Sequence, residues 1–156
     1  MERTLLLLKP DAVQRRLVGE IIERLESKGL TLCGLKMMRL DEATARSNYA
    51  EHEGKHFYEP LVRFMTSGPS IALALEGKDV AGVVRKLVGP TFGPDAPGGT
   101  VRGDYGVSNR FNLVHASDSP ESAERELALY FAEDELFEVK PCDLAWLYDF
   151  SEGDIV

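Results

Sequence analysis

The stretch TLLLLK, residues 4–9, holds four consecutive leucines between a threonine and a lysine. A short continuous apolar run of this kind is typical of a buried strand in the centre of a sheet. The dipeptide Pro10-Asp11 ends the run. The rest of the fold is therefore expected to be arranged around this strand.

Helical and strand-like segments follow this strand in turn. Apolar residues from Val13 to Leu25 recur at helical spacing, and Lys28-Gly29 closes that helix. The later segments are predicted as a strand at about 30–40, short helices over 41–66, a strand over 71–76, a helix over 80–88, a long Gly/Pro-rich loop up to residue 111, a last strand, a helix ending near Ala132 and a mostly irregular tail.

This order predicts an α+β fold, the ferredoxin-like βαββαβ arrangement, with an antiparallel sheet covered by helices. A doubly wound parallel sheet fits less well, because only two long crossover helices join the strands before the last one. A length of 156 residues suits a single domain with a sizeable core.

Composition excludes several classes of protein. The chain is 44% hydrophobic and 28% charged, as in ordinary globular proteins, and its formal net charge of −8 argues against a general or sequence-specific nucleic-acid binder. Local cations can still dominate a pocket for an anionic small molecule. Two cysteines are too few for a disulfide framework, and Cys33 is expected in the core. The apolar run at the N-terminus is too short for a signal peptide or membrane span, so a cytoplasmic location is expected.

The stretch FNLVHASDSPESAEREL, residues 111–127, places a histidine at the end of the last strand, just before a helix. Ser119 is predicted as the N-cap and Pro120 as the first helical residue, so His115 lies near free backbone N–H groups that bind anions. Glu126 lies on or beside the apolar stripe of that helix. It is either a partner for the imidazole or a long side chain that reaches water. His115, likewise, is either a hydrogen-bonded core residue or a catalyst.

Other signals are weaker. The sequence contains neither a Walker phosphate loop, nor a G-x-G-x-x-G fingerprint, nor the protein-kinase motifs. His52 and His56 are interpreted as surface or loop residues rather than as metal ligands. Three cations follow strands or lie in loops or helices near strand ends, but periodicity does not establish whether they are close to His115: Lys9, Arg85 and Arg102.

Four segments together resemble nucleoside diphosphate kinase: LLLLKPDAVQRRLVGEIIERLESKG, HFYEPLVRFMTSGP, APGGTVRGDYG and NLVHASDSPESAERE. The resemblance extends from Glu2 to about Asp149. It implies a ping-pong transfer of the γ-phosphate, mainly from ATP, to a nucleoside diphosphate through a phosphohistidine. The alternative is a catalytically inactive nucleotide-binding or regulatory scaffold on the same fold.

The resemblance also assigns roles to individual residues. His115 is the nucleophile, and Glu126 and Tyr49 orient it, with Ser117 beside them. Phe57 and Leu61 form the platform for the base, and Asp118 is expected to assist a magnesium ion that the nucleotide carries, with no direct protein site for the metal. The residues that hold phosphates and ribose hydroxyls are Lys9, Arg85, Thr91, Arg102 and Asn112.

The sequence departs from the family pattern at a few positions. Ala116 stands where glycine is most frequent, Phe111 replaces a basic residue, and the loop PTFGPDAPGG differs from the usual one. The kinase domain is expected over residues 1–149, with a short tail over 150–156. The resemblance implies a homo-oligomer, and the long carboxy-terminal segment favours a hexamer over a tetramer.

Overall fold

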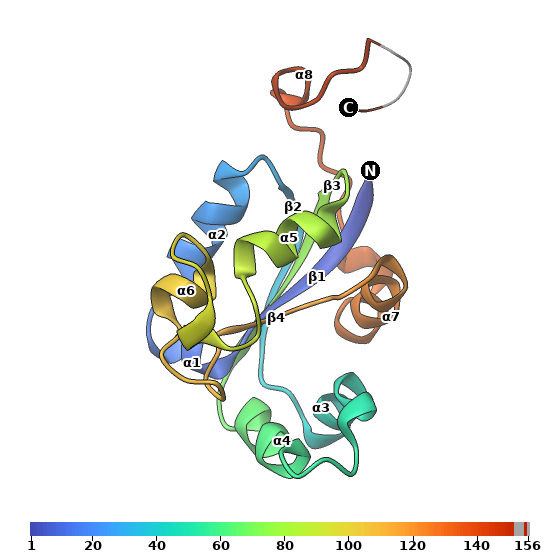
Figure 1. The fold of residues 1–156 in the computed structure, drawn as a ribbon. Helices are drawn as coiled ribbons and strands as arrows, with labels where there is room; N and C mark the ends of the chain where they lie inside the picture. Colours follow the sequence, from blue (N-terminus) through green and yellow to red (C-terminus); the bar gives the residue numbers. More distant parts are fainter. Residues whose placement is uncertain (152–154, 156) are drawn as a thin grey trace.

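A computed structural model describes residues 1–151 and 155 (Figure 1). Its centre is a four-stranded antiparallel sheet in the order β2-β3-β1-β4. The strands are β1 (Glu2–Leu8), β2 (Thr31–Met38), β3 (Ser70–Gly77) and β4 (Val114–Ala116). The helices are α1 (Pro10–Gln14), α2 (Val18–Ser27), α3 (Glu42–Asn48), α4 (Tyr58–Thr66), α5 (Val80–Val88), α6 (Val101–Tyr105), α7 (Pro120–Tyr130) and α8 (Leu144–Leu147), with single 3₁₀ turns η1 (Ala50–His52), η2 (Gly93–Asp95) and η3 (Glu133–Glu135).

The four leucines of β1 are fully buried because the strand lies between two layers of helices. Successive side chains of a strand point to opposite faces. Leu6 and Leu8 belong to one core cluster with apolar residues of α2 and α5, whereas Leu5 and Leu7 belong to a second cluster with residues of α3, α4 and α7. The structure confirms the α+β, ferredoxin-like prediction, with helices on both faces of the antiparallel sheet.

The predicted single helix from Val13 to Leu25 is wrong, because the chain forms two helices here. Arg16 adopts a left-handed conformation with φ of 60°. Its N–H donates to the Val13 carbonyl at 3.0 Å, and the N–H of Leu17 donates to the Ala12 carbonyl at 3.0 Å. These two bonds form a Schellman motif that ends α1, with arginine at the position that glycine usually occupies.

The last strand is shorter than the period-2 pattern indicated. Only Val114–Ala116 pair with β1, because Leu113 has φ of 72° and bends the chain away from the strand. The Leu113 N–H donates to Asp11 Oδ2 at 3.0 Å, and its carbonyl accepts from the Lys9 N–H at 2.8 Å. The bend therefore ties the residues before His115 to the start of α1.

The long loop after α5 contains two short helical segments that the sequence analysis did not predict, η2 and α6. Thr100 caps α6, because its Oγ1 accepts from the Gly103 N–H at 3.0 Å. The cap of α7 matches the prediction: Ser119 Oγ accepts from the Ser122 N–H at 3.1 Å, and Pro120 is the first helical residue.

The chain stays against the sheet as far as Phe137, whose N–H donates to the Cys33 carbonyl of β2 at 2.8 Å. The later helix α8 lies away from the centre of the sheet (Figure 1). Cys33 is 2% exposed, as predicted for a core residue. Part of the proposed tail over 150–156 lies outside the described residues, at 152–154 and 156. Across the part of the chain that the structure describes, no helix is both long and apolar enough to cross a membrane.

Candidate active site

His115 is held by a buried carboxylate on α7. Its Nε2 lies 3.0 Å from Glu126 Oε1, and Ser117 Oγ donates to Glu126 Oε2 at 2.6 Å. Glu126 is only 5% exposed, so this side chain turns toward His115 rather than reaching water. A carboxylate accepts only, which makes Nε2 the protonated nitrogen and leaves the lone pair on Nδ1.

The environment of Glu126 keeps it ionised. Burial by itself raises the pKa of the carboxyl group, but hydrogen bonds from His115 and Ser117 more than offset it, and the net pKa is below its usual value. Tyr49 lies beside this pair, with its ring 5.5 Å from the His115 ring in an edge-on contact. Burial, aided by the neighbouring Tyr130 and Glu126, raises the pKa of the Tyr49 phenol well above its usual value.

Two buried cations face the same space from different elements. Lys9 is 6% exposed, at the start of α1, and its Nζ donates to Asn112 Oδ1 at 2.8 Å. Burial, followed by the charge of Arg102, lowers the pKa of Lys9 to about 8. Burial and the charge of Arg85 likewise lower the pKa of Arg102 to about 10. These cations repel each other, and an anionic ligand would relieve the repulsion.

Backbone carbonyls fix Arg102. Its three guanidinium nitrogens donate to the carbonyls of Asn112 at 3.1 Å, Gly89 at 2.9 Å and Val114 at 2.7 Å. A guanidinium has five N–H donors, so two remain for a ligand. Asn112 is also fixed, because its Nδ2 donates to the Thr91 carbonyl at 3.0 Å.

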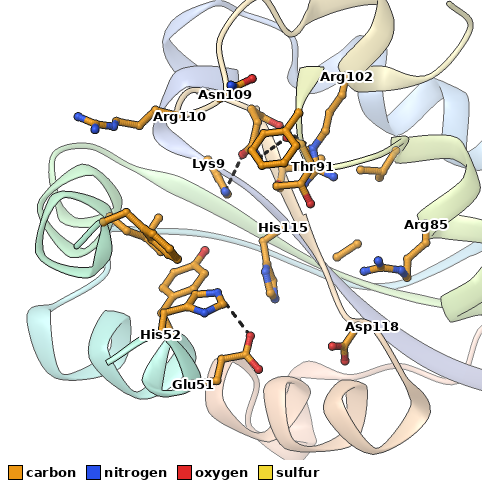
Figure 2. Close-up of a pocket in the computed structure, with 18 of the residues that line it drawn as sticks. Lys9, Glu51, His52, Arg85, Thr91, Arg102, Asn109, Arg110, His115 and Asp118 are labelled. Carbon is orange, nitrogen blue, oxygen red and sulfur yellow. Dashed lines mark hydrogen bonds and ion pairs between the residues drawn. The ribbon is translucent and has the colours of Figure 1, made fainter. Parts of the chain in front are cut away.

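These side chains line one cavity of about 680 Å³ between η1, α4, α5, α7 and the long loop (Figure 2). The volume suits a nucleotide-sized ligand. The cavity brings together these residues of the sequence prediction: Lys9, Tyr49, Phe57, Leu61, Arg85, Thr91, Arg102, Asn112, His115, Asp118 and Glu126. Ser117, at 1% exposed, lies behind them against Glu126.

The cavity has further lining residues that the sequence analysis did not select. His52 and His56, interpreted there as surface or loop residues, both contact the Phe57 ring edge-on, at 5.3 and 5.5 Å. Both histidines lie within five residues of Phe57 in the sequence, and this closeness to the expected base platform could have indicated that they line the cavity. The remaining lining residues are Glu51, Val88, Gly89, Phe92, Asn109, Arg110, Val114, Ala116, Ser122 and Arg125.

Phe111, one of the positions that depart from the family pattern, has a structural role. Its ring lies 5.0 Å from the Phe64 ring in an edge-on contact, which joins the long loop to α4 at one side of the cavity. Asp118 lines the opposite part, near Arg85 (Figure 2). A hydrogen bond from Ser122 lowers the pKa of Asp118, and the charges of Arg85 and His115 add to this effect.

Carboxylate oxygens such as those of Asp118 are suitable ligands for a hard divalent cation. Among the described residues, however, there is no group of three or more His, Cys, Asp or Glu side chains arranged to hold a metal ion.

Residues 2–136 match the family model for nucleoside diphosphate kinase. The chain belongs to this family. It is 50% identical to the nucleoside diphosphate kinase of a Synechococcus species, over 96% of this chain and all of that protein, and 55% identical to that of Staphylothermus marinus, over 88% and 97%. A halophilic nucleoside diphosphate kinase from Halobacterium salinarum, solved in complex with CDP, superimposes with a TM-score of 0.93 at 49% identity, covering 95% and 99% of the two chains.

These similarities establish the activity. The protein is an enzyme, a nucleoside diphosphate kinase, and a nucleotide-binding phosphotransferase of nucleotide metabolism. Reactions of this type generally need a divalent metal ion. Nothing in the comparisons favours the inactive scaffold that was the alternative.

Proposed function

We propose that His115 is the nucleophile of a ping-pong phosphoryl transfer and that Nδ1 is the attacking atom. The observation that carries the proposal is the bond between His115 Nε2 and buried Glu126, at 3.0 Å, inside a cavity lined by cations. Because Nε2 is engaged, Nδ1 is the nitrogen available to a phosphoryl group.

The proposed transfer takes place in two half-reactions. The Nδ1 lone pair attacks the γ-phosphorus, the bond from that phosphorus to the β–γ bridging oxygen breaks, and a nucleoside diphosphate leaves. In the second half-reaction a terminal oxygen of another nucleoside diphosphate attacks the phosphorus, and the P–N bond breaks. Two half-reactions through one covalent intermediate give ping-pong kinetics.

Histidine suits this exchange for thermodynamic reasons. The same phosphoanhydride type is broken and made, so the overall free energy is near zero, and a useful intermediate must lie at comparable energy. A phosphoserine ester would lie lower and slow the second transfer, whereas a P–N bond returns its phosphoryl group readily. Neutral imidazole also needs no strong base near neutral pH.

Glu126 and Ser117 act on the imidazole rather than on the substrate. The carboxylate fixes the ring orientation and the tautomer, and it stabilises the positive charge that develops on the ring as Nδ1 bonds to phosphorus. The Ser117 hydroxyl, donating at 2.6 Å, holds the second carboxylate oxygen in place. Tyr49 packs against the ring edge and limits its rotation.

The phosphates occupy the cationic part of the cavity. Lys9, Arg85 and Arg102 supply the charge that stabilises the transferring phosphoryl group, and Asn112 holds Lys9. Thr91 and Asn112 also bind phosphate or ribose hydroxyl groups. A Mg²⁺ ion bound to the nucleotide phosphates, with help from Asp118, would neutralise further negative charge when present.

The base lies on Phe57 and Leu61 of the α4 region. Stacking and apolar contact do not read the edge of a base, so ribose and phosphates carry the recognition and the enzyme accepts several bases. CDP occupies the related protein from Halobacterium salinarum. The further proposals are a kinase domain over 1–149 with a tail over 150–156, a homo-oligomer with a hexamer favoured over a tetramer, and a cytoplasmic location.

One labelling experiment tests the site. The protein is incubated with Mg²⁺ and γ-labelled ATP, freed of nucleotide and digested at alkaline pH. Acid-labile phosphate on His115 that is discharged by GDP or dTDP is the expected result. Stable label on a serine, or exchange activity retained by a His115→Ala variant, would overturn the assignment.

A further inference from the structure

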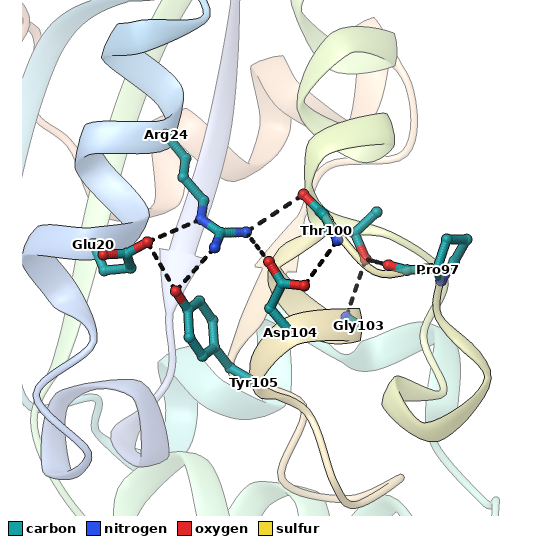
Figure 3. Close-up of polar contacts among 8 residues, drawn as sticks. Glu20, Arg24, Pro97, Thr100, Gly103, Asp104 and Tyr105 are labelled. Carbon is teal, nitrogen blue, oxygen red and sulfur yellow. Dashed lines mark hydrogen bonds and ion pairs between the residues drawn. The ribbon is translucent and has the colours of Figure 1, made fainter.

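An ion-pair network joins α2 to α6 (Figure 3), and none of its residues lines the cavity. Arg24 of α2 donates through Nη1 to Asp104 Oδ2 at 2.6 Å and through Nη2 to the Tyr105 hydroxyl at 2.9 Å. Its Nε donates to Glu20 Oε1 at 3.2 Å, and the Tyr105 hydroxyl donates to the same oxygen at 2.8 Å. Each nitrogen of the Arg24 guanidinium therefore has a partner.

The network continues into the loop that precedes α6. The other Asp104 oxygen accepts from the Gly99 N–H at 2.8 Å. This bond and the Arg24 charge lower the pKa of Asp104, so the carboxylate is ionised at neutral pH. A Cβ on Gly103 would lie 1.9 Å from the Pro97 carbonyl oxygen, so the loop packs closely against the helix. Asp104 thus links α2, the loop and α6.

Helix α6 depends on such contacts, because five residues are too few for a helix to be stable by itself. Its inner side carries Arg102, which is 9% exposed and bonded to three carbonyls beside the cavity. Its outer side carries Asp104 and Tyr105. The orientation of Arg102 therefore depends on an inner set of bonds and on an outer set made by Arg24.

The same outer contacts reach the element that carries Lys9. Lys9 is the N-cap of α1, and α2 follows α1 after a three-residue turn. Arg15, in that turn, donates to the Tyr105 carbonyl at 2.7 Å. The α1–α2 unit and α6 therefore form one block that presents Lys9 and Arg102 to the cavity.

We propose that Arg24 and Asp104 are positioning residues for the nucleotide phosphates: by joining α2 to α6 they fix the separation of Lys9 and Arg102. This inference rests on the proposed function, in which both cations bind phosphate. Neither Arg24 nor Asp104 lines the cavity, so they act only through the elements they connect.

The test compares two matched arginines. Arg24→Met removes the network but keeps an unbranched apolar side chain of similar reach. Arg3→Met is the control, because Arg3 also forms an ion pair, with Glu76 at 2.9 Å, although Arg24 has a second carboxylate partner in Glu20. The side chains are 34% and 22% exposed in the Arg3–Glu76 pair and 25% and 28% exposed in the Arg24–Asp104 pair. Arg3 lies at the start of β1, at the opposite end of this strand from Lys9, and it does not line the cavity.

We expect Arg24→Met to raise KM for both the triphosphate and the diphosphate by about tenfold, with kcat within about twofold, since a displaced phosphate cradle weakens binding. Arg3→Met should leave both KM values unchanged. A purely structural loss of folded enzyme would lower the apparent kcat and leave KM unchanged. Hydrogen exchange at the amides of residues 98–106 should be faster in Arg24→Met and unchanged in Arg3→Met.

Two milder variants test the same inference if Arg24→Met does not fold. Asp104→Asn keeps an acceptor for the Gly99 N–H but replaces the oxygen that accepts from Arg24 with an NH2 group, and it should raise KM in the same direction by a smaller factor. Arg24→Lys should recover part of the wild-type KM. Unchanged KM values in soluble Asp104→Asn and Arg24→Met would overturn the inference while wild-type exchange persists. Absence of exchange and of His115 labelling in the wild type would instead overturn the proposed function.

Discussion

The lowered pKa of Lys9 makes alkaline pH a direct probe of the phosphate site. The protonated amine is the form that attracts phosphate, and burial and the Arg102 charge move its pKa from the usual 10.5 to about 8. Above that pH the protonated fraction falls about tenfold per pH unit, and at pH 9 about one molecule in ten retains the charge. We therefore predict that kcat/KM declines above pH 8 and approaches a slope of −1 in a logarithmic plot.

A bound phosphate should reverse part of this effect. Phosphate stabilises the charged amine, so the pKa of Lys9 rises in the complex, and kcat should decline at a higher pH than kcat/KM. The measurement is steady-state exchange between ATP and dTDP from about pH 6.5 to pH 9, at fixed ionic strength and below the pKa of about 10 of Arg102. Lys9→Met has no charge to lose, so its kcat/KM should be about 10²- to 10³-fold lower at pH 7 and flat at alkaline pH.

Lys9→Arg is the matched control, because a guanidinium keeps its charge throughout this range. Its alkaline decline should be absent or displaced upward, whatever its activity at pH 7. A wild-type profile that stays level to pH 9, together with a large loss in Lys9→Met, would refute the reasoning from burial. Lys9 would then be essential, but its pKa would be ordinary.

Further predictions test the imidazole, the base platform, the core and the backbone. Glu126→Gln should lower kcat by about 10- to 100-fold with little change in KM, because a neutral amide fixes the His115 tautomer less strongly. The rate of single-turnover phosphorylation would measure this loss, and an unaltered rate would show that Glu126 does not orient the imidazole. Phe57→Ala should raise KM more than it lowers kcat, and an unchanged KM would remove this residue from the base site. Leu6→Ala should lower the free energy of unfolding in urea by about 2–5 kcal/mol, against less than about 1.5 kcal/mol for Leu6→Met. Arg16→Gly should raise it by about 1 kcal/mol, because the φ of 60° suits glycine, and a loss of stability would show that the arginine side chain outweighs the strain.

The sequence predicted helices and strands correctly where the signal comes from residues close together along the chain, such as a cap or a regular spacing of apolar side chains. The Ser119 cap and Pro120 start α7 as expected, and the apolar spacing located its buried face, with Leu127 at 8% exposed. The leucines of β1 indicated a central strand for the same reason. Glu126 remained ambiguous from sequence, because its bond to His115 depends on how α7 packs on the sheet.

Features that depend on contacts between distant segments were not predictable in this way. Arg16 is an exception, because the bonds that end α1 are local, but its residue type carries no signal for a left-handed conformation. The short strand β4 follows from Leu113 bonding to Asp11, 102 residues earlier. The meeting of Lys9 and Asn112 spans 103 residues, and no local pattern encodes it.

The bond between Lys9 and Asn112 has a consequence for the synthesis of the protein. The amine that binds phosphate leaves the ribosome near the beginning of translation, whereas its amide partner, His115 and Glu126 leave near the end. Pairings this distant along the chain form late, since a large loop must close first. A nascent chain that has not yet released α7 therefore holds no assembled site, so the proposed phosphorylation of His115 requires that α7 has left the ribosome and packed on the sheet.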